Sequence, residues 1–172
     1  GVEHFFLYNN NSSDHFRDVL AEFKCITLVE WPLVRHQQRA AYEHCLETFG
    51  SRSRWIAFFD IDEFLFCPSA LSIVPALRDH EASPGIAVKS LLFGTSGHYD
   101  VPALVLPSFM RRSAVPGLCK SIADPRRVRF IRDPHRFSYY GAAQAAEPPL
   151  EAVRLNHYFA RSIRGLEQKA AR

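Results

Sequence analysis

The first third of the chain alternates between short apolar runs and segments in which apolar residues recur at helical spacing. Strand-like runs cover residues 2–8, 25–30 and 55–59. Apolar positions three and four residues apart predict helices over residues 14–24 and 34–49 between them. The third run is apolar throughout, as in strands covered on both faces. This order predicts an α/β domain with right-handed crossovers and a doubly wound sheet.

After Gly85 the pattern changes to shorter runs separated by loops that contain proline, glycine and serine. These strand-like runs lie at residues 86–93, 104–110, 128–131 and 153–158. Ser72 and Ser162 each precede a segment that can form a helix, so both are predicted as helix caps. The whole of residues 1–172 is therefore predicted to form one domain whose second half is irregular and partly antiparallel.

Composition supports one soluble core. Of 172 residues, 47% are hydrophobic, and the most apolar stretch, residues 101–110, is about half the ~20 residues that a membrane span needs. The four cysteines lack CxxC spacing and have apolar neighbours, which predicts free thiols in a reducing compartment such as the cytoplasm. The chain starts directly on a strand-like run, so we interpret it as a piece of a longer polypeptide. The longer polypeptide could associate with a membrane through the part that is missing here.

The net charge of +3 is concentrated in one segment. Residues 120–136 hold six basic and two acidic side chains. A local excess of this kind favours a local anionic partner over nucleic acid. Nucleic-acid binding would also require aromatic residues interleaved with the basic ones, and this pattern is poorly developed here. A solvated strand edge is the alternative, and we prefer it for Arg126, Arg127 and Arg129.

The strongest chemical signal is the sequence Asp60-Ile61-Asp62, directly after the third apolar run. In an extended chain Asp60 and Asp62 project to one side and Ile61 packs inward. Ligands of open α/β sheets bind at the carboxyl ends of the strands. Two adjacent carboxylates need a proton, a basic partner or a cation, and oxygen ligands favour magnesium or manganese. The alternative is that both carboxylates cap a loop and pair with arginines.

Several motifs along the chain resemble glycosyltransferase family 92 and related bacterial family-2-like enzymes. The matching segments are residues 8–14 (YNNNSSD), 31–32, Gln38, 55–64 (WIAFFDIDEF), 93–98 (FGTSGH), Lys120, His135, 156–158 and 161–162. The resemblance implies a GT-A fold, that of nucleotide-diphospho-sugar transferases, whose first strand and helix would be missing here. It also implies a UDP-sugar donor, a glycan or other hydroxyl acceptor, and a divalent cation, Mn²⁺ or Mg²⁺.

The resemblance also assigns roles to individual side chains. It implies that the cation is held by Asp60, Asp62 and His157. Donor binding would fall to Asn10, Ser12, Asp14, Asp60, Gly94 and Gly97. Lys120 would neutralise the diphosphate leaving group, and His98 and His135 would lie on the acceptor side. An inverting hexosyl transfer needs a base; Asp100 is our candidate, and Glu63, Glu147 and Glu151 are the alternatives.

Each of these assignments has a structural alternative. His157 can be a strand histidine hydrogen-bonded in the core. The segment that contains Asn10, Ser12 and Asp14 can be a turn followed by a helix cap. The glycines at 94 and 97 can belong to an ordinary connecting loop.

Two other function classes were weighed. Haloacid-dehalogenase-like phosphatases and phosphotransferases also carry two aspartates after a strand, but a threonine follows there where Phe64 stands here. A non-catalytic carbohydrate- or calcium-binding module would need several oxygen ligands in one loop, whereas these are dispersed. A metal-dependent glycosyltransferase is therefore the function that the sequence favours.

Overall fold

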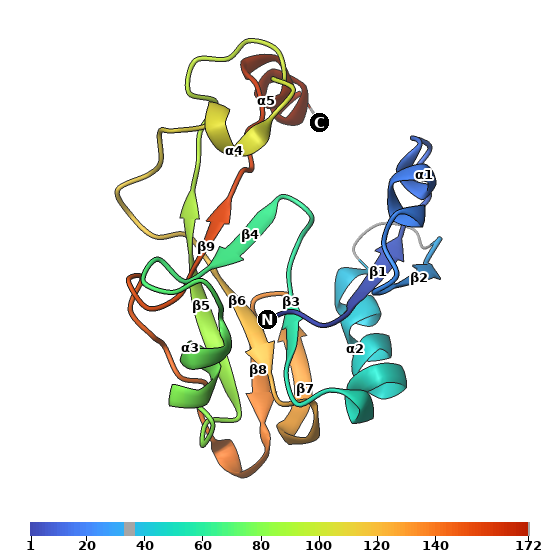
Figure 1. The fold of residues 1–172 in the computed structure, drawn as a ribbon, viewed down its shortest axis with the longest axis vertical. Coiled ribbons are helices and arrows are strands. Elements are labelled where there is room, and N and C mark those ends of the chain that lie inside the picture. Colours follow the sequence, from blue (N-terminus) through green and yellow to red (C-terminus); the bar gives the residue numbers. More distant parts are fainter. Residues whose placement is uncertain (33–36, 172) are drawn as a thin grey trace.

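The computed structural model describes residues 1–32 and 37–171 and shows a mixed α/β protein, as predicted (Figure 1). Within those ranges the largest sheet has five strands in the order β3-β6-β5-β9-β4. Their bounds are β3 Ile56–Phe58, β4 Glu63–Phe66, β5 Gly85–Leu92, β6 Cys119–Ala123 and β9 Arg154–His157. β5 and β9 are parallel, and the other three pairs are antiparallel. The predicted antiparallel character of the second half is confirmed.

The first two strands form a separate parallel pair. β1 (Phe5–Asn9) and β2 (Ile26–Glu30) are joined by α1 (Phe16–Ala21), which confirms the predicted strand–helix–strand unit. In the described part of the chain neither strand is hydrogen-bonded to β3, so the expected continuous doubly wound sheet is divided. Helix α2 (Gln38–Phe49) provides the connection instead, because it packs against both sheets. Residues 34–36 of the predicted helix lie outside the described residues.

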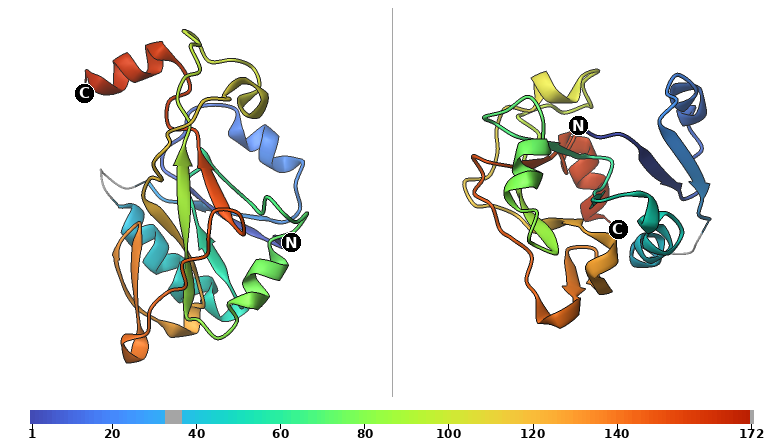
Figure 2. Two further views of the ribbon diagram at one scale, coloured as in Figure 1. Left: turned by 90° about the vertical axis from the view of Figure 1, so that its left-hand side faces the viewer. Right: turned by 60° about the horizontal axis from the view of Figure 1, so that its bottom comes forward.

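Two hydrophobic cores hold the sheets and helices together. One is built on β5, β6 and β9 and is covered by α3 (Val74–Asp79). The other joins α2, β3 and the first strand pair to a hairpin formed by β7 (Val128–Asp133) and β8 (Arg136–Tyr139). Figure 2 shows α3 and this hairpin on opposite sides of the central sheet. The central strands are therefore packed on both faces.

One predicted strand is wrong. Residues 104–110 form the short helix α4 (Val105–Ser108) and not a strand. Pro107 lacks the N–H that a strand ladder requires, and only Phe109 of this run is fully buried, whereas Leu104, Leu106 and Met110 are exposed. Phe109 is therefore the side chain through which this run reaches the interior, and hydrogen bonds at Ser108 and Met110 attach it to the loop after β5.

The carboxyl-terminal helix agrees with its prediction. Helix α5 (Ile163–Ala170) is capped by Ser162, whose hydroxyl accepts a hydrogen bond from the backbone N–H of Gly165 at 2.9 Å. Short 3-10 turns within the described ranges are η1 (Gly50–Arg52), η2 (Pro125–Arg127) and η3 (Tyr140–Ala142). Figure 1 places α4 and α5 together at one end of the molecule.

Two global expectations also have outcomes. All four cysteines lie in the described ranges and are free thiols; Cys45 and Cys67 are buried. In the part of the chain that the structure describes, no helix combines the length and apolar character needed to cross a bilayer.

Replacing Gly85 with alanine is expected to lower the free energy of unfolding by about 1–3 kcal/mol, because the site is overpacked. A β-carbon there would lie 2.7 Å from Cζ of the buried Tyr139 ring and 3.0 Å from the Ile122 carbonyl oxygen. Urea denaturation measures the change. Gly94→Ala is the matched control, because a β-carbon at Gly94 meets no atom within 4 Å. An equal loss in both variants would contradict the packing argument.

Candidate active site

The acidic motif lies in a tight turn between β3 and β4. The backbone N–H of Glu63 donates to the Asp60 carbonyl at 3.1 Å, which closes the turn. Ile61 stands at its tip and is 93% exposed. The expectation that Ile61 packs inward was therefore wrong, because β3 ends at Phe58 and the chain reverses direction before β4 begins. The side chains of Asp60 and Asp62 therefore project from a turn and not from an extended strand.

Asp60 is held in place from three directions. The Lys120 Nζ atom donates to Oδ2 at 2.7 Å, and the Gln38 side-chain amide donates to Oδ1. The backbone N–H of Asp60 donates to Oε2 of Glu63 at 2.8 Å. Lys120 comes from β6, which pairs with β3, and Gln38 begins α2. The side chain of Asp60 therefore has a fixed orientation, although it is partly exposed.

Glu63 connects the two halves of the site. Its side chain is 2% exposed and lies 3.5 Å from Lys120 Nζ through one oxygen and 3.7 Å from His157 Nδ1 through the other. The register of β4 against β9 places Glu63 opposite His157. Burial raises the pKa of Glu63, and the Asp60 N–H and Lys120 oppose that change. Sequence analysis named Glu63 only as an alternative base, because its burial depends on strand pairing and leaves no local signal.

Asp62 and His157 form a second, partly exposed part of the site. Asp62 Oδ1 lies 3.5 Å from His157 Nε2, and their side chains are 27% and 21% exposed. The N–H of Tyr158 donates to the Asp62 carbonyl at 2.9 Å, which attaches the turn to the end of β9. The hydrogen bond with Asp62 raises the pKa of His157. Burial opposes this change, and the charges of Asp62, Glu63 and Asp60 add to it.

The cluster carries more acidic than basic groups. Asp60, Asp62 and Glu63 face one buried lysine and one histidine. Beside them, burial raises the pKa of Tyr42, and the charges of Asp60 and Glu63 add to this shift. Among the described residues no group of three or more His, Cys, Asp or Glu side chains is arranged as a metal site. The predicted ligand set of Asp60, Asp62 and His157 therefore stays a prediction.

Comparison with known proteins identifies the family. The model of "Glycosyltransferase family 92" matches residues 1–158. A family 92 protein of Oryza sativa subsp. japonica is 29% identical over 168 residues, and one of Ricinus communis is 30% identical over 170 residues. Each alignment covers 92% of this chain. The chain belongs to glycosyltransferase family 92.

Relatives from family 92 are considerably longer than this chain. The chain spans 29% of the rice protein and 30% of the Ricinus communis protein. A protein of Arabidopsis thaliana from the same family is 27% identical, again with 30% of its length covered. The resemblance that the sequence motifs carried is thus confirmed, and the part compared is one segment of these longer proteins.

Three of the six predicted donor residues of this family 92 chain, Asn10, Ser12 and Asp14, lie in the loop between β1 and α1. The Ser12 N–H donates to the side-chain oxygen of Asn9 at 3.0 Å, and Asp14 Oδ1 accepts from the N–H of Phe16 at 3.3 Å. Asn10 is exposed. The turn is confirmed, but the cap is not, because the N-cap of α1 is His15 and it makes no side-chain cap hydrogen bond. The donor role of this segment stays a prediction.

The glycine loop after β5 is fixed by its neighbours. The Gly94 N–H donates to the Arg111 carbonyl at 3.0 Å, and Gly97 adopts a φ of 90°, where glycine is favoured. The His98 ring contacts the Ser108 carbonyl at 3.0 Å and the edge of Phe109. This loop is therefore more than a flexible connection, because it joins β5 to the α4 region.

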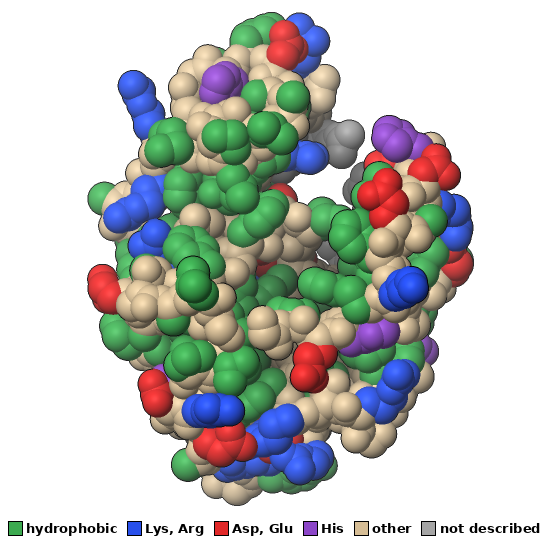
Figure 3. All heavy atoms as spheres, viewed as in Figure 1, with side chains coloured by type: hydrophobic (Ala, Val, Ile, Leu, Met, Phe, Trp, Pro, Cys, Tyr) green, Lys and Arg blue, Asp and Glu red, His purple; other side chains and the backbone are tan. Residues whose placement is uncertain are grey.

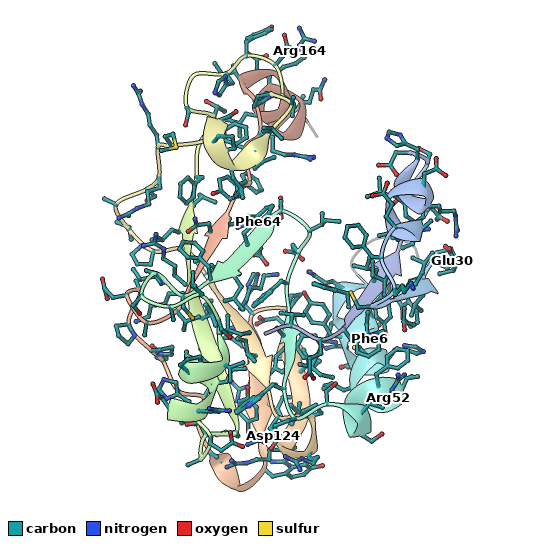
Figure 4. The ribbon with its side chains drawn as sticks, viewed as in Figure 1. Phe6, Glu30, Arg52, Phe64, Asp124 and Arg164 are labelled. Carbon is teal, nitrogen blue, oxygen red and sulfur yellow. The ribbon has the colours of Figure 1, made fainter. Side chains whose placement is uncertain are left out.

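The basic segment divides into parts with different surroundings. Lys120 lies in the site, whereas Arg126 pairs with Asp124, which directly follows β6 and is labelled in the lower part of Figure 4. His135, at the β7–β8 turn, contacts the carbonyl of Cys119 through Nδ1 at 3.0 Å. His135 is thus next to the strand that carries Lys120, while Arg126 has the structural role that we preferred for it.

Asp100, the candidate base, lies beyond the glycine loop. Its carboxylate forms an exposed ion pair with Arg164 of α5 at 3.0 Å. This ion pair directs Asp100 towards α5 and not towards the acidic turn. Its assignment as a base stays a prediction.

Proposed function

We propose that this chain forms the donor-binding part of a glycosyltransferase that moves a hexose from a UDP-sugar to a hydroxyl of a glycan. Family 92 membership supports glycosyl transfer in general. The observation that carries the proposal is the accessible Asp62–His157 pair beside Asp60, which Lys120 and Gln38 hold in place. An excess of carboxylates at an exposed turn favours a bound cation, and a diphosphate fills the positions that such a cation leaves free.

The side chains at the turn are chemically compatible with Mn²⁺ as its ligands. Asp62 offers carboxylate oxygens and His157 offers an imidazole nitrogen, both of which manganese accepts. Asp60 is the third candidate ligand, although Lys120 already donates to one of its oxygens. A cation bound here would neutralise the negative charge that develops on the diphosphate leaving group.

The side chains around the turn have supporting tasks in this proposal. Lys120 is 1% exposed, so its contacts favour holding Asp60 and Glu63 over reaching a leaving group directly. The exposed β1–α1 loop would hold the nucleotide through Asn10, Ser12 and Asp14. Gly94 and Gly97 would let the donor sugar approach the backbone. For an inverting transfer, we propose Asp100 as the base that takes the proton of the acceptor hydroxyl.

UDP is expected to stabilise the protein against heat only when Mn²⁺ is present. At a concentration of 100 times the dissociation constant, a ligand that binds only the folded state adds about 2.7 kcal/mol. Thermal unfolding with UDP alone, Mn²⁺ alone and both together measures the effect. A phosphatase of the haloacid-dehalogenase type would instead respond to Mg²⁺ with a phosphate mimic. Equal stabilisation by UDP with and without the cation would contradict the proposed site.

A further inference from the structure

A pocket lies beside the candidate active site. It has a volume of about 380 Å³, and its lining includes Asp100, Phe159, Arg161, Arg164 and Gln168. These residues come from the loop after β5 and from the segment that runs from the end of β9 into α5. The volume falls within the range of small-molecule sites. The pocket is therefore large enough for a sugar ring.

Backbone hydrogen bonds fix the two walls of this pocket relative to each other. The N–H of Ile163 donates to the His98 carbonyl at 2.9 Å, and the N–H of Arg164 donates to the Tyr99 carbonyl at 3.2 Å. Ser162 is buried between them and caps α5. The two segments are thus joined at the base of the pocket, so its shape does not depend on side-chain contacts alone.

The polar groups of the pocket offer both hydrogen-bond donors and acceptors. Arg164 Nη1 contacts Asp100 Oδ1 at 3.0 Å, and its guanidinium lies 5.1 Å from the centre of the Tyr99 ring. Figure 4 labels Arg164 on α5, at the end of the molecule that also carries α4. A carboxylate accepts from a hydroxyl and a guanidinium donates to one. Held side by side, these two groups match neighbouring hydroxyls of a sugar.

Phe159 supplies an apolar surface and connects the pocket to the active site. Its side chain is 42% exposed, and its ring lies edge-on to the His157 ring at a centroid distance of 5.8 Å. The face of an aromatic ring carries partial negative charge and attracts the C–H groups of a sugar. Because His157 belongs to the acidic site, a ring packed on Phe159 would lie next to the proposed donor. Figure 3 shows the surface hollowed between the parts of the molecule that carry α5 and α1.

We propose that this pocket is an acceptor subsite that binds one neutral hexose ring, with Phe159 beneath the ring and the Asp100–Arg164 pair at its hydroxyls. The inference rests on the proposed glycosyl transfer and adds the class of acceptor to it. The lining holds Arg161 and Arg164 against Asp100. We choose a neutral sugar over an anion because the Asp100 carboxylate engages Arg164 and would repel a second negative charge, and the comparison with charged ligands tests the contribution of Arg161.

The test uses the complete 172-residue chain and heteronuclear NMR titrations with methyl glycosides of glucose, galactose and mannose. The subsite predicts that at least one glycoside shifts the backbone amide signals of residues 159–165 in a saturable manner. Phe159→Ala should weaken that binding about tenfold, which corresponds to 1.4 kcal/mol, whereas Phe159→Tyr should retain it. Arg164→Gln should also weaken it, because a charge-assisted donor is lost.

Separate readouts distinguish this subsite from the nucleotide site. UDP with Mn²⁺ should still bind Phe159→Ala, and the methyl glycoside should still bind Asp62→Asn. If the wild-type chain does not bind UDP with Mn²⁺, the proposed function is contradicted. Binding of the methyl glycoside to the pocket can still be measured in that case. The subsite is refuted if no glycoside shifts these amides, if Phe159→Ala binds as tightly as the wild type, or if glucuronate and inorganic phosphate bind in preference to the neutral sugars.

Discussion

Replacing Lys120 with methionine is expected to lower the free energy of unfolding by about 3–5 kcal/mol, the usual cost of removing one partner from a buried ion pair. Methionine keeps most of the apolar length of the side chain, so the loss reports the charge. Lys120 is 1% exposed, and its Nζ atom lies 2.7 Å from Asp60 and 3.5 Å from Glu63. Without the ammonium, the carboxylate of Glu63 stays buried with no cation from β6. Urea denaturation at neutral pH measures the difference.

The loss in Lys120→Met should also depend on pH. Burial already places the pKa of Glu63 above its ordinary value of 4.5, and removing Lys120 raises it further. A group with a raised pKa binds more protons in the folded state, so its contribution to stability is complete below pH 4.5 and is lost as the pH rises through the folded pKa. The variant should therefore approach the wild type in acid. Adding Glu63→Gln should recover much of the loss at neutral pH, and a double variant no more stable than Lys120→Met would contradict the coupling.

Asp62→Asn is expected to reduce both the affinity for UDP with Mn²⁺ and the rate of sugar transfer, each on the order of 10²–10³-fold, because a charged group is removed from the proposed cation site. The side chain is partly exposed and asparagine has the same shape, so the free energy of unfolding should stay within about 0.5 kcal/mol of the wild type. Calorimetric titration of UDP in the presence of Mn²⁺ measures the affinity, and consumption of the UDP-sugar measures the rate.

Asp79→Asn is the matched control for this substitution. Asp79 is an exposed aspartate at the end of α3 and takes no part in the acidic turn. The change removes the same charge from the protein, so any effect of net charge on an anionic ligand appears in both variants. If the cation binds at the turn, only Asp62→Asn should lose affinity for UDP with Mn²⁺ and transfer rate, and Asp79→Asn should keep both. Equal losses in the two variants would assign the effect to long-range charge.

Much of the first half of the fold could be predicted from local sequence patterns. β1, α1, β2, α2 and β3 all lie within the predicted ranges or close to their ends, because each has the apolar spacing of its own element. How the strands pair could not be predicted in the same way. The separation of the first strand pair from β3 depends on α2 packing between them, which is a tertiary contact and leaves no periodic signal.

Strands with buried polar residues could not be recognised from their apolar pattern. β6 contains Lys120 and Ser121, both buried, because this strand lies between β3 and β5 and carries the lysine to the acidic site. β4 begins with Glu63, whose burial likewise serves that cluster. Polar residues at interior positions interrupt the alternation that predicts a strand. Strands that contain such residues are therefore not recognised from the sequence pattern.

The candidate site was predicted in part. Asp60, Asp62, Lys120 and His157 come from three separate regions of the sequence, and the structure brings them together around one turn. The family motifs provided that grouping, since the distances along the chain contain no such information. The contact of Gln38 with Asp60 was not predicted, although Gln38 belongs to the matching motifs. The roles of the loop residues remain predictions, because hydrogen bonds such as those of Asn9 and Asp14 also occur in ordinary turns.

We propose that a divalent cation binds at the β3–β4 turn together with the phosphates of a nucleotide. Mn²⁺ is paramagnetic and broadens the NMR signals of nearby nuclei, so adding it in small amounts to the 19.6 kDa chain with UDP locates the ion directly. The amide signals of residues 61–63 and 157–158 are expected to broaden first, and Asp62→Asn is expected to abolish the effect. Broadening that starts elsewhere on the surface, with these amides unchanged, would contradict this proposal.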